Sequence, residues 1–198
     1  MQNRGLMKEL IHSLCCLPGI GPKSAQRIAF HLLQRNREGG LQLSKILAEA
    51  MLNIQHCSEC RTLSEAVLCE ICSNQSRDDS LLCVVESPAD TWIIDQATTF
   101  KGKYFVLHGR LSPLDGIGPD QIGMDLLEQR MQSARITEII LATNSTVEGQ
   151  ATAYFIGEVA AKYQIRTTRI AHGIPMGGEL EFIDSSTLSH AFNGRREI

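Results

Sequence analysis

Apolar residues recur at helical spacing through the first third of the chain, in three successive stretches. The first stretch stops at residues 18–22, a run rich in helix breakers, and the second starts at Lys23. We expect Gly39 and Gly40 to end the second helix, before a third begins. The apolar positions are Leu6, Met7, Leu10, Ile11 and Leu14; Ala25, Ile28, Ala29, Leu32 and Leu33; and Leu43, Ile46, Leu47, Ala50, Met51 and Ile54. The pattern predicts a helical hairpin and a third helix with one side in a core.

After residue 80 the pattern changes to short β-type runs that alternate with helical segments. The expected strands cover residues 81–85, 104–107, 138–141 and 166–171, and the expected helices cover 88–96, 120–135 and 149–163. Right-handed crossovers between such strands give a largely parallel sheet with helices on both faces. In the tail we expect a glycine-rich loop, a strand near 180–183 and a short helix over 187–192. The prediction is therefore an α/β fold that follows an N-terminal helical region.

The composition fits a folded protein, since 198 residues with 43% hydrophobic and 21% charged positions can bury the core of one or two domains. The start of the chain lacks the long apolar run of a secretory signal, and nothing reaches membrane-spanning length, so we expect a cytoplasmic protein without a membrane partner. Seven Lys and Arg accompany three acidic residues up to His56, whereas twelve accompany nineteen from Cys57 onward. This asymmetry favours a basic end that binds nucleic acid, although an ordinary solvated surface also explains it.

The turn between the first two helices has the residues of a phosphate-binding site. Gly19 and Gly21 bracket one apolar residue, so the backbone can turn tightly and expose its amides at a helix start, where the dipole favours an anion. On a helical wheel, Lys23 and Arg27 point away from the apolar side. Residues 17–33 resemble a helix-hairpin-helix, a motif that contacts nucleic-acid phosphates without reading bases. The alternative is a plain helical turn with solvated cations.

Four cysteines form two CxxC pairs separated by eight residues: Cys57, Cys60, Cys69 and Cys72. This spacing predicts a structural site for one Zn²⁺, because four thiolates fill a tetrahedron and leave no position for water. Without an export signal, metal binding is favoured over disulfides, and a redox dithiol is the remaining alternative. We expect loss of one ligand to unfold this segment, which contains too little apolar surface to fold without the metal.

Glu86 follows the apolar run 81–85, where α/β sheets commonly place functional groups. Together with the segment IILATNSTVEG at 139–149, it resembles the Toprim fold of topoisomerases, primases and some nucleases. In those enzymes the second motif contains two aspartates, whose positions here hold Asn144 and Thr146. Only Glu86 and Glu148 remain to offset a divalent cation, so we expect a vestigial site without catalysis. The alternative for both glutamates is solvated acid, with Glu148 capping a helix.

The order of these motifs along almost the whole chain resembles the RecR family of bacterial recombination mediators. The resemblance is carried by the hairpin, the four cysteines and the segments VVESPAD, HGRLSPLDGIGP, LATNSTVEGQATA and RIAHGIPMGGELEFIDSSTL. It implies a ring-shaped DNA clamp, a tetramer or dimer without catalytic activity, associated with the nucleoid. With the partners RecO and RecF, such a clamp helps to load RecA on single-stranded DNA in recombinational repair. The resemblance also assigns Lys23 and Arg27 to DNA contacts and the four cysteines to zinc.

We expect four parts: a helix-hairpin-helix domain over residues 1–56, a zinc finger over 57–72, a Toprim-like domain over 80–175 and a C-terminal segment over 176–198 that subunits could exchange. Two other functions remain as alternatives. A magnesium-dependent Toprim nuclease or topoisomerase-like enzyme would depend on Glu86. A zinc-held protein adaptor without affinity for nucleic acid would suit the acidic C-terminal part.

Overall fold

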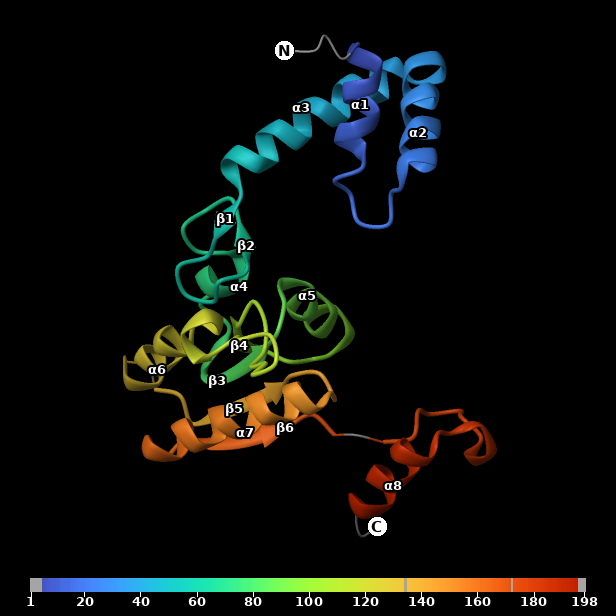
Figure 1. Cartoon of the computed structure of the whole chain (residues 1–198). Coiled ribbons are helices and arrows are strands. Elements are labelled where there is room, and N and C mark those ends of the chain that lie inside the picture. Colours follow the sequence, from blue (N-terminus) through green and yellow to red (C-terminus); the bar gives the residue numbers. More distant parts are fainter. Residues whose placement is uncertain (1–4, 134, 172, 196–198) are drawn as a thin grey trace. The chain divides into compact units, whose positions relative to one another are not determined.

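The computed structural model describes residues 5–133, 135–171 and 173–195, and the chain divides into two compact units between Ile54 and Gln55. The first unit contains α1 (Leu6–Leu14), α2 (Pro22–Arg35) and α3 (Arg37–Asn53) (Figure 1). α1 packs against α2, and the buried residues of α2 are Ala25 and Ala29. The predicted hairpin is therefore present, with small side chains where the helices approach each other.

The boundary between α2 and α3 lies at Asn36, and the expectation that Gly39 and Gly40 end a helix is wrong. Asn36 leaves the helical conformation, and its side-chain oxygen accepts a hydrogen bond of 3.0 Å from the Gly39 N–H. This N-cap starts α3 at Arg37, so that both glycines lie inside its first turns. A Cβ on Gly39 would clash with the Asn36 side chain. The glycine is needed because the cap approaches closely.

The apolar side of α3 is exposed in the single chain, so the expected burial of this helix is not observed. None of the residues of α3 is buried, and Met51 is 72% exposed while Leu43, Ile46 and Leu47 are about half exposed. The periodicity correctly indicated a helix. It did not show what the helix packs against, because a repeat of apolar residues is the same whether its partner belongs to this chain or to another.

The second unit begins with a small module that carries the four cysteines. A two-stranded antiparallel ladder, β1 (Gln55–His56) with β2 (Leu63–Ser64), precedes the short helix α4 (Glu70–Ser73). The four cysteine side chains, which lie in the loops around these elements and in α4, form a buried cluster with Leu68 and Ile71 packed against it. The module thus has almost no core apart from its sulfur atoms.

A four-stranded parallel sheet follows, in the spatial order β4-β3-β5-β6. Its strands are β3 (Asp78–Val85), β4 (Gly102–Val106), β5 (Glu138–Ala142) and β6 (Arg166–Arg169). The register pairs Val85 with Ala142, so that the residues after β3 and β5 meet at the same edge of the sheet. The predicted parallel α/β arrangement is confirmed, and it places Glu86 beside the segment that follows β5.

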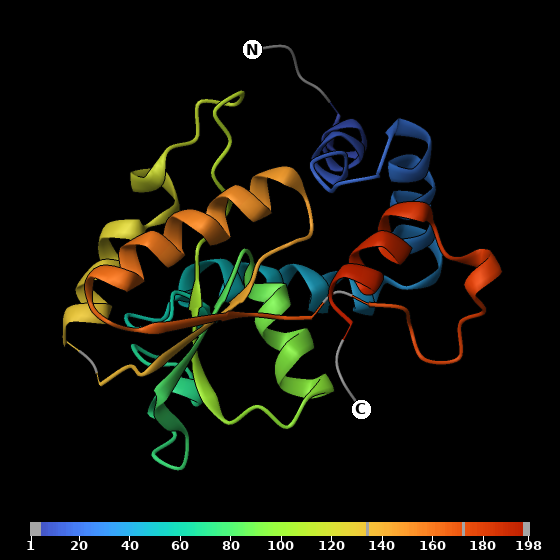
Figure 2. The same ribbon diagram turned by 90° about the horizontal axis from the view of Figure 1, so that it is seen from below.

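Helices cover both faces of the sheet, as expected. α5 (Pro88–Ala97) packs on one face, whereas α6 (Met124–Ser133) and α7 (Val147–Lys162) pack on the other (Figure 2). The helix expected over 120–135 is divided into the 3₁₀ turn η1 (Pro119–Ile122) and α6 by Gly123, which has a φ of 74°. The left-handed conformation of Gly123 ends the 3₁₀ turn, and glycine adopts this conformation without strain.

The C-terminal segment contains the 3₁₀ turn η2 (Leu180–Phe182) and α8 (Ser185–Asn193). The strand expected near 180–183 is therefore wrong. Alternating apolar residues favour a strand, but a strand also needs a neighbour with which to form a ladder, and here Leu180 and Phe182 are 63% and 79% exposed. α8 begins at Asp184, whose carboxylate caps its first turn. None of the helices within the described residues is long and apolar enough to cross a lipid bilayer.

Candidate nucleic-acid interface and metal site

The loop between α1 and α2 begins with a tight β turn over residues 17–20. The Ile20 N–H donates to the carbonyl of Leu17 at 3.1 Å, and Gly19 adopts a φ of 78° at the third position of the turn. A positive φ at this position is characteristic of a type II turn, which glycine adopts without strain. A Cβ built on Gly19 or Gly21 would meet nothing within 4 Å, so the backbone of this loop faces open space.

The loop leads directly into a helix start whose amides are open. Gly21 is the N-cap of α2, and the first helical residue, Pro22, has no N–H. Within the described residues no side chain caps this helix, so the N–H groups of Lys23 and Ser24 have neither an intrahelical acceptor nor a capping oxygen. Lys23 and Arg27 are exposed one turn apart on the same helix, and neither forms an ion pair with a residue that the structure describes. The structure thus places open amides, a positive helix end and two exposed cations on one surface.

The four cysteine sulfurs converge on a single point. The Sγ atoms of Cys57, Cys60, Cys69 and Cys72 all lie within 4.8 Å of one another, and those of Cys60 and Cys69 are 3.5 Å apart. Four sulfurs at about 2.3 Å from a tetrahedral zinc ion lie about 3.8 Å from each other, so the cluster fits Zn²⁺. The backbone N–H groups of Cys69 and Cys72 donate to the sulfurs of Cys57 and Cys69, which stabilises thiolates.

The protonation of the cluster also depends on a cation. Hydrogen bonding to Cys69 raises the pKa of Cys60 to about 12, whereas the same bond lowers the pKa of Cys69. Hydrogen bonding to Cys60 and to Cys69, together with burial, raises the pKa of Cys72. Four neighbouring thiolates therefore form only when a metal ion offsets their charge, and zinc binding releases protons. Since four sulfurs complete the tetrahedron, the zinc is structural.

The carboxyl edge of the sheet carries a second cluster, around Glu86. The chain passes from β3 to β4 on one side and then crosses to β5 on the other, so Glu86 lies at the point where the direction of winding reverses. Ligand sites in α/β sheets form at this position. Glu86 is only 6% exposed, and beside it lies a cavity of about 360 Å³ that Asn144, Asp90 and His108 also line.

Both oxygens of Glu86 are occupied by donors from Asn144. The backbone N–H of Asn144 donates to Oε1 at 2.8 Å, and its side-chain Nδ2 donates to Oε2 at 2.7 Å. An aspartate at this position would accept hydrogen bonds or ligate a metal, but it could not donate from its side chain. Asn144 stands where Toprim enzymes have an aspartate, which could ligate a metal ion. Its amide instead holds Glu86 in place by hydrogen bonds.

The second aspartate position has also acquired a structural task. Thr146 is the N-cap of α7, and its hydroxyl accepts from the Gly149 N–H at 3.1 Å. Glu148 lies half-buried in the first turn of α7, where a negative charge is favoured by the helix dipole. Gly149 packs so closely on this cluster that a Cβ there would clash with the Asn144 carbonyl. Thr146 thus caps the start of α7, and Asn144, two residues earlier, binds this segment to Glu86 at the end of β3.

Two arginines that sequence reasoning did not single out bring positive charge to the same edge. The Arg110 guanidinium lies 3.7 Å from Oε2 of Glu86, and Arg169 at the end of β6 donates to the Asn144 carbonyl at 3.4 Å. At this distance the Arg110 guanidinium offsets the negative charge of the buried Glu86 carboxylate. The same positive charge repels a divalent cation that approaches Glu86. Arg110 was detectable only as part of the loop after β4, because no spacing in the sequence links it to Glu86.

Comparison with known proteins agrees with the parts described above. Family models match in four consecutive segments: a RecR helix-hairpin-helix over residues 7–51, a RecR four-cysteine zinc finger domain over 54–74, a Toprim domain over 80–171 and a RecR C-terminal region over 173–196. The chain is also 55% identical over 198 residues to the recombination protein RecR of Methylococcus capsulatus strain Bath, and the match covers all of both chains. With its zinc finger, its Toprim domain and its helical hairpin, the chain belongs to the RecR family of recombination proteins.

Proposed function

We propose that this protein is a non-enzymatic DNA clamp in recombinational repair, which grips the sugar-phosphate backbone through the hairpin between α1 and α2. The observation that carries the proposal is the open helix start behind Gly21, with Lys23 and Arg27 exposed beside it. An uncapped helix N-terminus and two cations bind phosphate oxygens without distinguishing bases. The proposed DNA-binding residues are therefore Gly19, Gly21, Lys23 and Arg27.

Membership of the RecR family supports the wider part of the proposal, in which the clamp helps to load RecA on single-stranded DNA with RecO and RecF in the cytoplasm, at the nucleoid. One hairpin offers few cations, so a single subunit should bind DNA weakly. Several copies closed around one strand would add avidity. The exposed apolar side of α3 supports such an assembly, because an apolar helix face of this length needs a covering partner.

We further propose that the parts have the bounds expected from sequence, a DNA-binding domain over residues 1–56, a zinc finger over 57–72, a Toprim-like domain over 80–175 and an exchanged segment over 176–198. The Toprim-like part has no catalytic role in this proposal. The donors that surround Glu86 support this, since Asn144 and Arg110 take the place that a magnesium ion would need.

A DNA-binding titration with paired variants tests the proposal. Lys23→Ala/Arg27→Ala removes two cations beside the open helix start, and we expect affinity for DNA of any sequence to fall about tenfold, with a salt dependence reduced by about one unit per lost phosphate contact. The control is Arg35→Ala/Lys45→Ala, which removes the same charge from exposed positions away from the loop. We expect this control to bind nearly as well as the unchanged protein.

Equal loss in both double variants would show that overall charge, rather than the hairpin, governs binding, and would contradict the proposed site. Incubation of supercoiled DNA with magnesium and the unchanged protein tests the second part. Nicking that disappears in Glu86→Gln would establish a Toprim enzyme and overturn the non-enzymatic proposal. Absence of DNA retention even at low salt would instead favour a protein adaptor.

A further inference from the structure

Both halves of the zinc cluster are attached to the edge strand β4. We call residues 57–60 the first knuckle and residues 69–72 the second knuckle. β4 is an outer strand of the sheet, paired on one side with β3, so its other side presents backbone groups without a strand partner. The Val106 N–H on that side donates to the Cys60 carbonyl at 2.9 Å. The first knuckle therefore covers the sheet edge with a backbone hydrogen bond.

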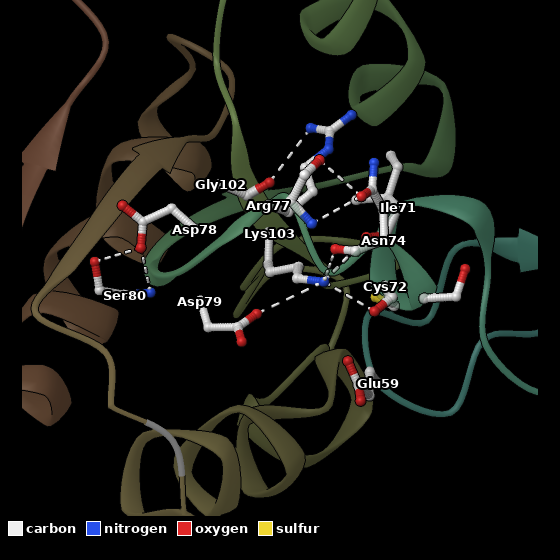
Figure 3. A network of polar contacts seen from close by, with 12 residues as sticks. Glu59, Ile71, Cys72, Asn74, Arg77, Asp78, Asp79, Ser80, Gly102 and Lys103 are labelled. Atoms are coloured by element: carbon white, nitrogen blue, oxygen red, sulfur yellow. Dashed lines mark hydrogen bonds and ion pairs between the residues drawn. The ribbon is translucent and has the colours of Figure 1, made fainter.

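Lys103, the second residue of β4, reaches the second knuckle. Its side chain is 6% exposed, and its Nζ lies 2.8 Å from the Cys72 carbonyl, 3.1 Å from that of Ile71 and 3.2 Å from that of Asn74 (Figure 3). An ammonium has three hydrogens, and three carbonyl oxygens in and just after α4 accept them, while the exposed carboxylate of Asp79 lies 3.6 Å from the same Nζ. Ile71 and Cys72 lie in α4 and Asn74 is its C-cap, whose carbonyl also accepts from the Arg77 backbone N–H. Lys103 therefore holds the backbone that carries Cys72.

Arg130 attaches the first knuckle in a similar way from α6. Its NH1 group donates to the Glu59 carbonyl at 3.0 Å and to the Tyr104 carbonyl of β4 at 2.8 Å. One guanidinium nitrogen thus bridges the knuckle and the strand. Lys103 and Arg130 act on different knuckles, but both connect the metal-binding backbone to β4.

The positive charges of Lys103 and Arg130 also offset the negative charge that the four-cysteine cluster carries once zinc is bound. A zinc ion with four thiolates carries a net charge of −2 in a cluster whose sulfur ligands are all buried. Buried charge is costly unless opposite charge or hydrogen bonds offset it. We propose that Lys103 and Arg130 are positioning residues for zinc, which hold the two knuckles on β4 so that retention of the metal depends on the edge of the Toprim sheet.

A purely structural role for these cations makes a different prediction, and Arg77 distinguishes the two. Arg77 forms a bidentate ion pair with Asp95 and also donates to the carbonyls of Phe100 and Gly102, next to Lys103. None of these side-chain bonds reaches either knuckle, and the backbone hydrogen bond from Arg77 to the Asn74 carbonyl remains when the side chain is replaced. Within the described residues, the Arg77 side chain therefore stabilises the same edge of the sheet without contacting the metal ligands. Its ion pair lowers the pKa of Asp95, as expected for a charge that matters to stability.

The test compares zinc retention in full-length Lys103→Met, Arg130→Met and Arg77→Met proteins by competition with a chromogenic chelator. Groups that hydrogen-bond to metal-binding residues and hold them in place typically contribute 10- to 100-fold in metal affinity. We therefore expect Lys103→Met to lose zinc affinity by roughly this factor and Arg130→Met by about tenfold. Arg77→Met should retain zinc within about twofold, even though its unfolding midpoint falls.

Cobalt substitution adds a readout that a change in stability does not move. The visible absorption of Co²⁺ in a tetrahedral sulfur site reports ligand geometry, and we expect the bands of Lys103→Met to shift or weaken, with partial recovery in Lys103→Arg, which keeps the charge. Arg77→Met should keep the bands of the unchanged protein.

Zinc affinity that falls in Arg77→Met as much as in Lys103→Met would show that the metal site only follows overall stability, and would overturn the proposal. Unchanged affinity in both Lys103→Met and Arg130→Met would do the same. If Lys103→Met does not fold, Arg130→Met decides the question, because Arg130 is half-buried and its loss leaves the packing of α6 in place.

Discussion

The amide of Asn144 decides what the carboxyl edge of this Toprim sheet can do. Its Nδ2 and backbone N–H donate to the two oxygens of Glu86, at 2.7 and 2.8 Å. An aspartate at position 144 would bring a second negative charge next to Glu86, which is only 6% exposed. Asn and Asp have nearly the same shape, yet only Asn donates from its side chain. The Nδ2 of Asn144 therefore makes a structural hydrogen bond to Glu86, where an aspartate oxygen would be a potential metal ligand.

Asn144→Asp tests this interpretation. We expect it to lower the free energy of unfolding by about 2 kcal/mol, because a donor is lost and two carboxylates face each other. Urea denaturation of the full-length protein measures the change. Thr146→Ser is the matched control, since serine keeps the hydroxyl that caps α7, and its stability should stay within about 0.5 kcal/mol of the unchanged protein.

Addition of millimolar magnesium during the same denaturation provides a further check. A ligand that binds the folded state raises its stability, so an unchanged midpoint is expected for the unchanged protein, whose Glu86 already has donors on both oxygens. A magnesium-dependent rise in that protein would show an intact metal site and contradict our interpretation of Arg110 and Asn144.

The junction of α2 and α3 shows how a local cap overrides the usual meaning of glycine. A pair of glycines commonly ends a helix, but here Asn36 accepts from the Gly39 N–H and begins α3 before the pair. Gly39 is close to the cap, whereas a Cβ on Gly40 would lie 3.7 Å from Leu32, an ordinary van der Waals contact. The two adjacent glycines therefore have different steric requirements.

A comparison of Gly39→Ala with Gly40→Ala measures that difference. Both gain helix propensity, but only Gly39→Ala should disrupt the Asn36 cap, so we expect it to be less stable than Gly40→Ala by about 1 to 2 kcal/mol. Hydrogen exchange of the amides in α3 measures the stability of this element. Equal protection in the two variants would show that the cap contributes little.

Two exposed apolar surfaces support our proposal that several copies of the chain assemble. They are the apolar side of α3 and the side chains of Leu180, Phe182 and Phe192 in the C-terminal segment, which are exposed in the part of the chain that the structure describes. Exposed apolar surface of this kind is usually buried against another protein chain. Exchange of the C-terminal segment between copies, as proposed above, would bury this surface and would give residues 180–183 a strand neighbour, which they do not have among the described residues.

Deletion of residues 187–198 tests this exchange. We expect the truncated protein to form smaller oligomers than the full-length chain, because α8 and its apolar residues would no longer bridge subunits. Light scattering gives the mass of each, and circular dichroism shows whether the remainder stays folded. An unchanged mass in a folded truncated protein would discard the exchange and leave α3 as the candidate interface.

Much of the fold follows from local pattern in the sequence. The helical spacing around Ala25 and Ala29 and the apolar runs that became β3 and β5 correctly indicated their elements, since each reflects which side of the element is buried. The two CxxC pairs predicted the zinc site because ligand spacing and ligand chemistry are both properties of a short segment.

The contacts that give these parts their roles depend on residues far apart in sequence. Glu86 meets Arg110 and Asn144 only because β3 lies between β4 and β5, and Lys103 reaches the Cys72 carbonyl only because the second knuckle folds over the sheet edge. The strand expected near 180–183 was wrong for the same reason, since a ladder needs a neighbour. Periodicity and spacing record local burial and local chemistry, whereas partners across the sheet exist only once the chain has folded.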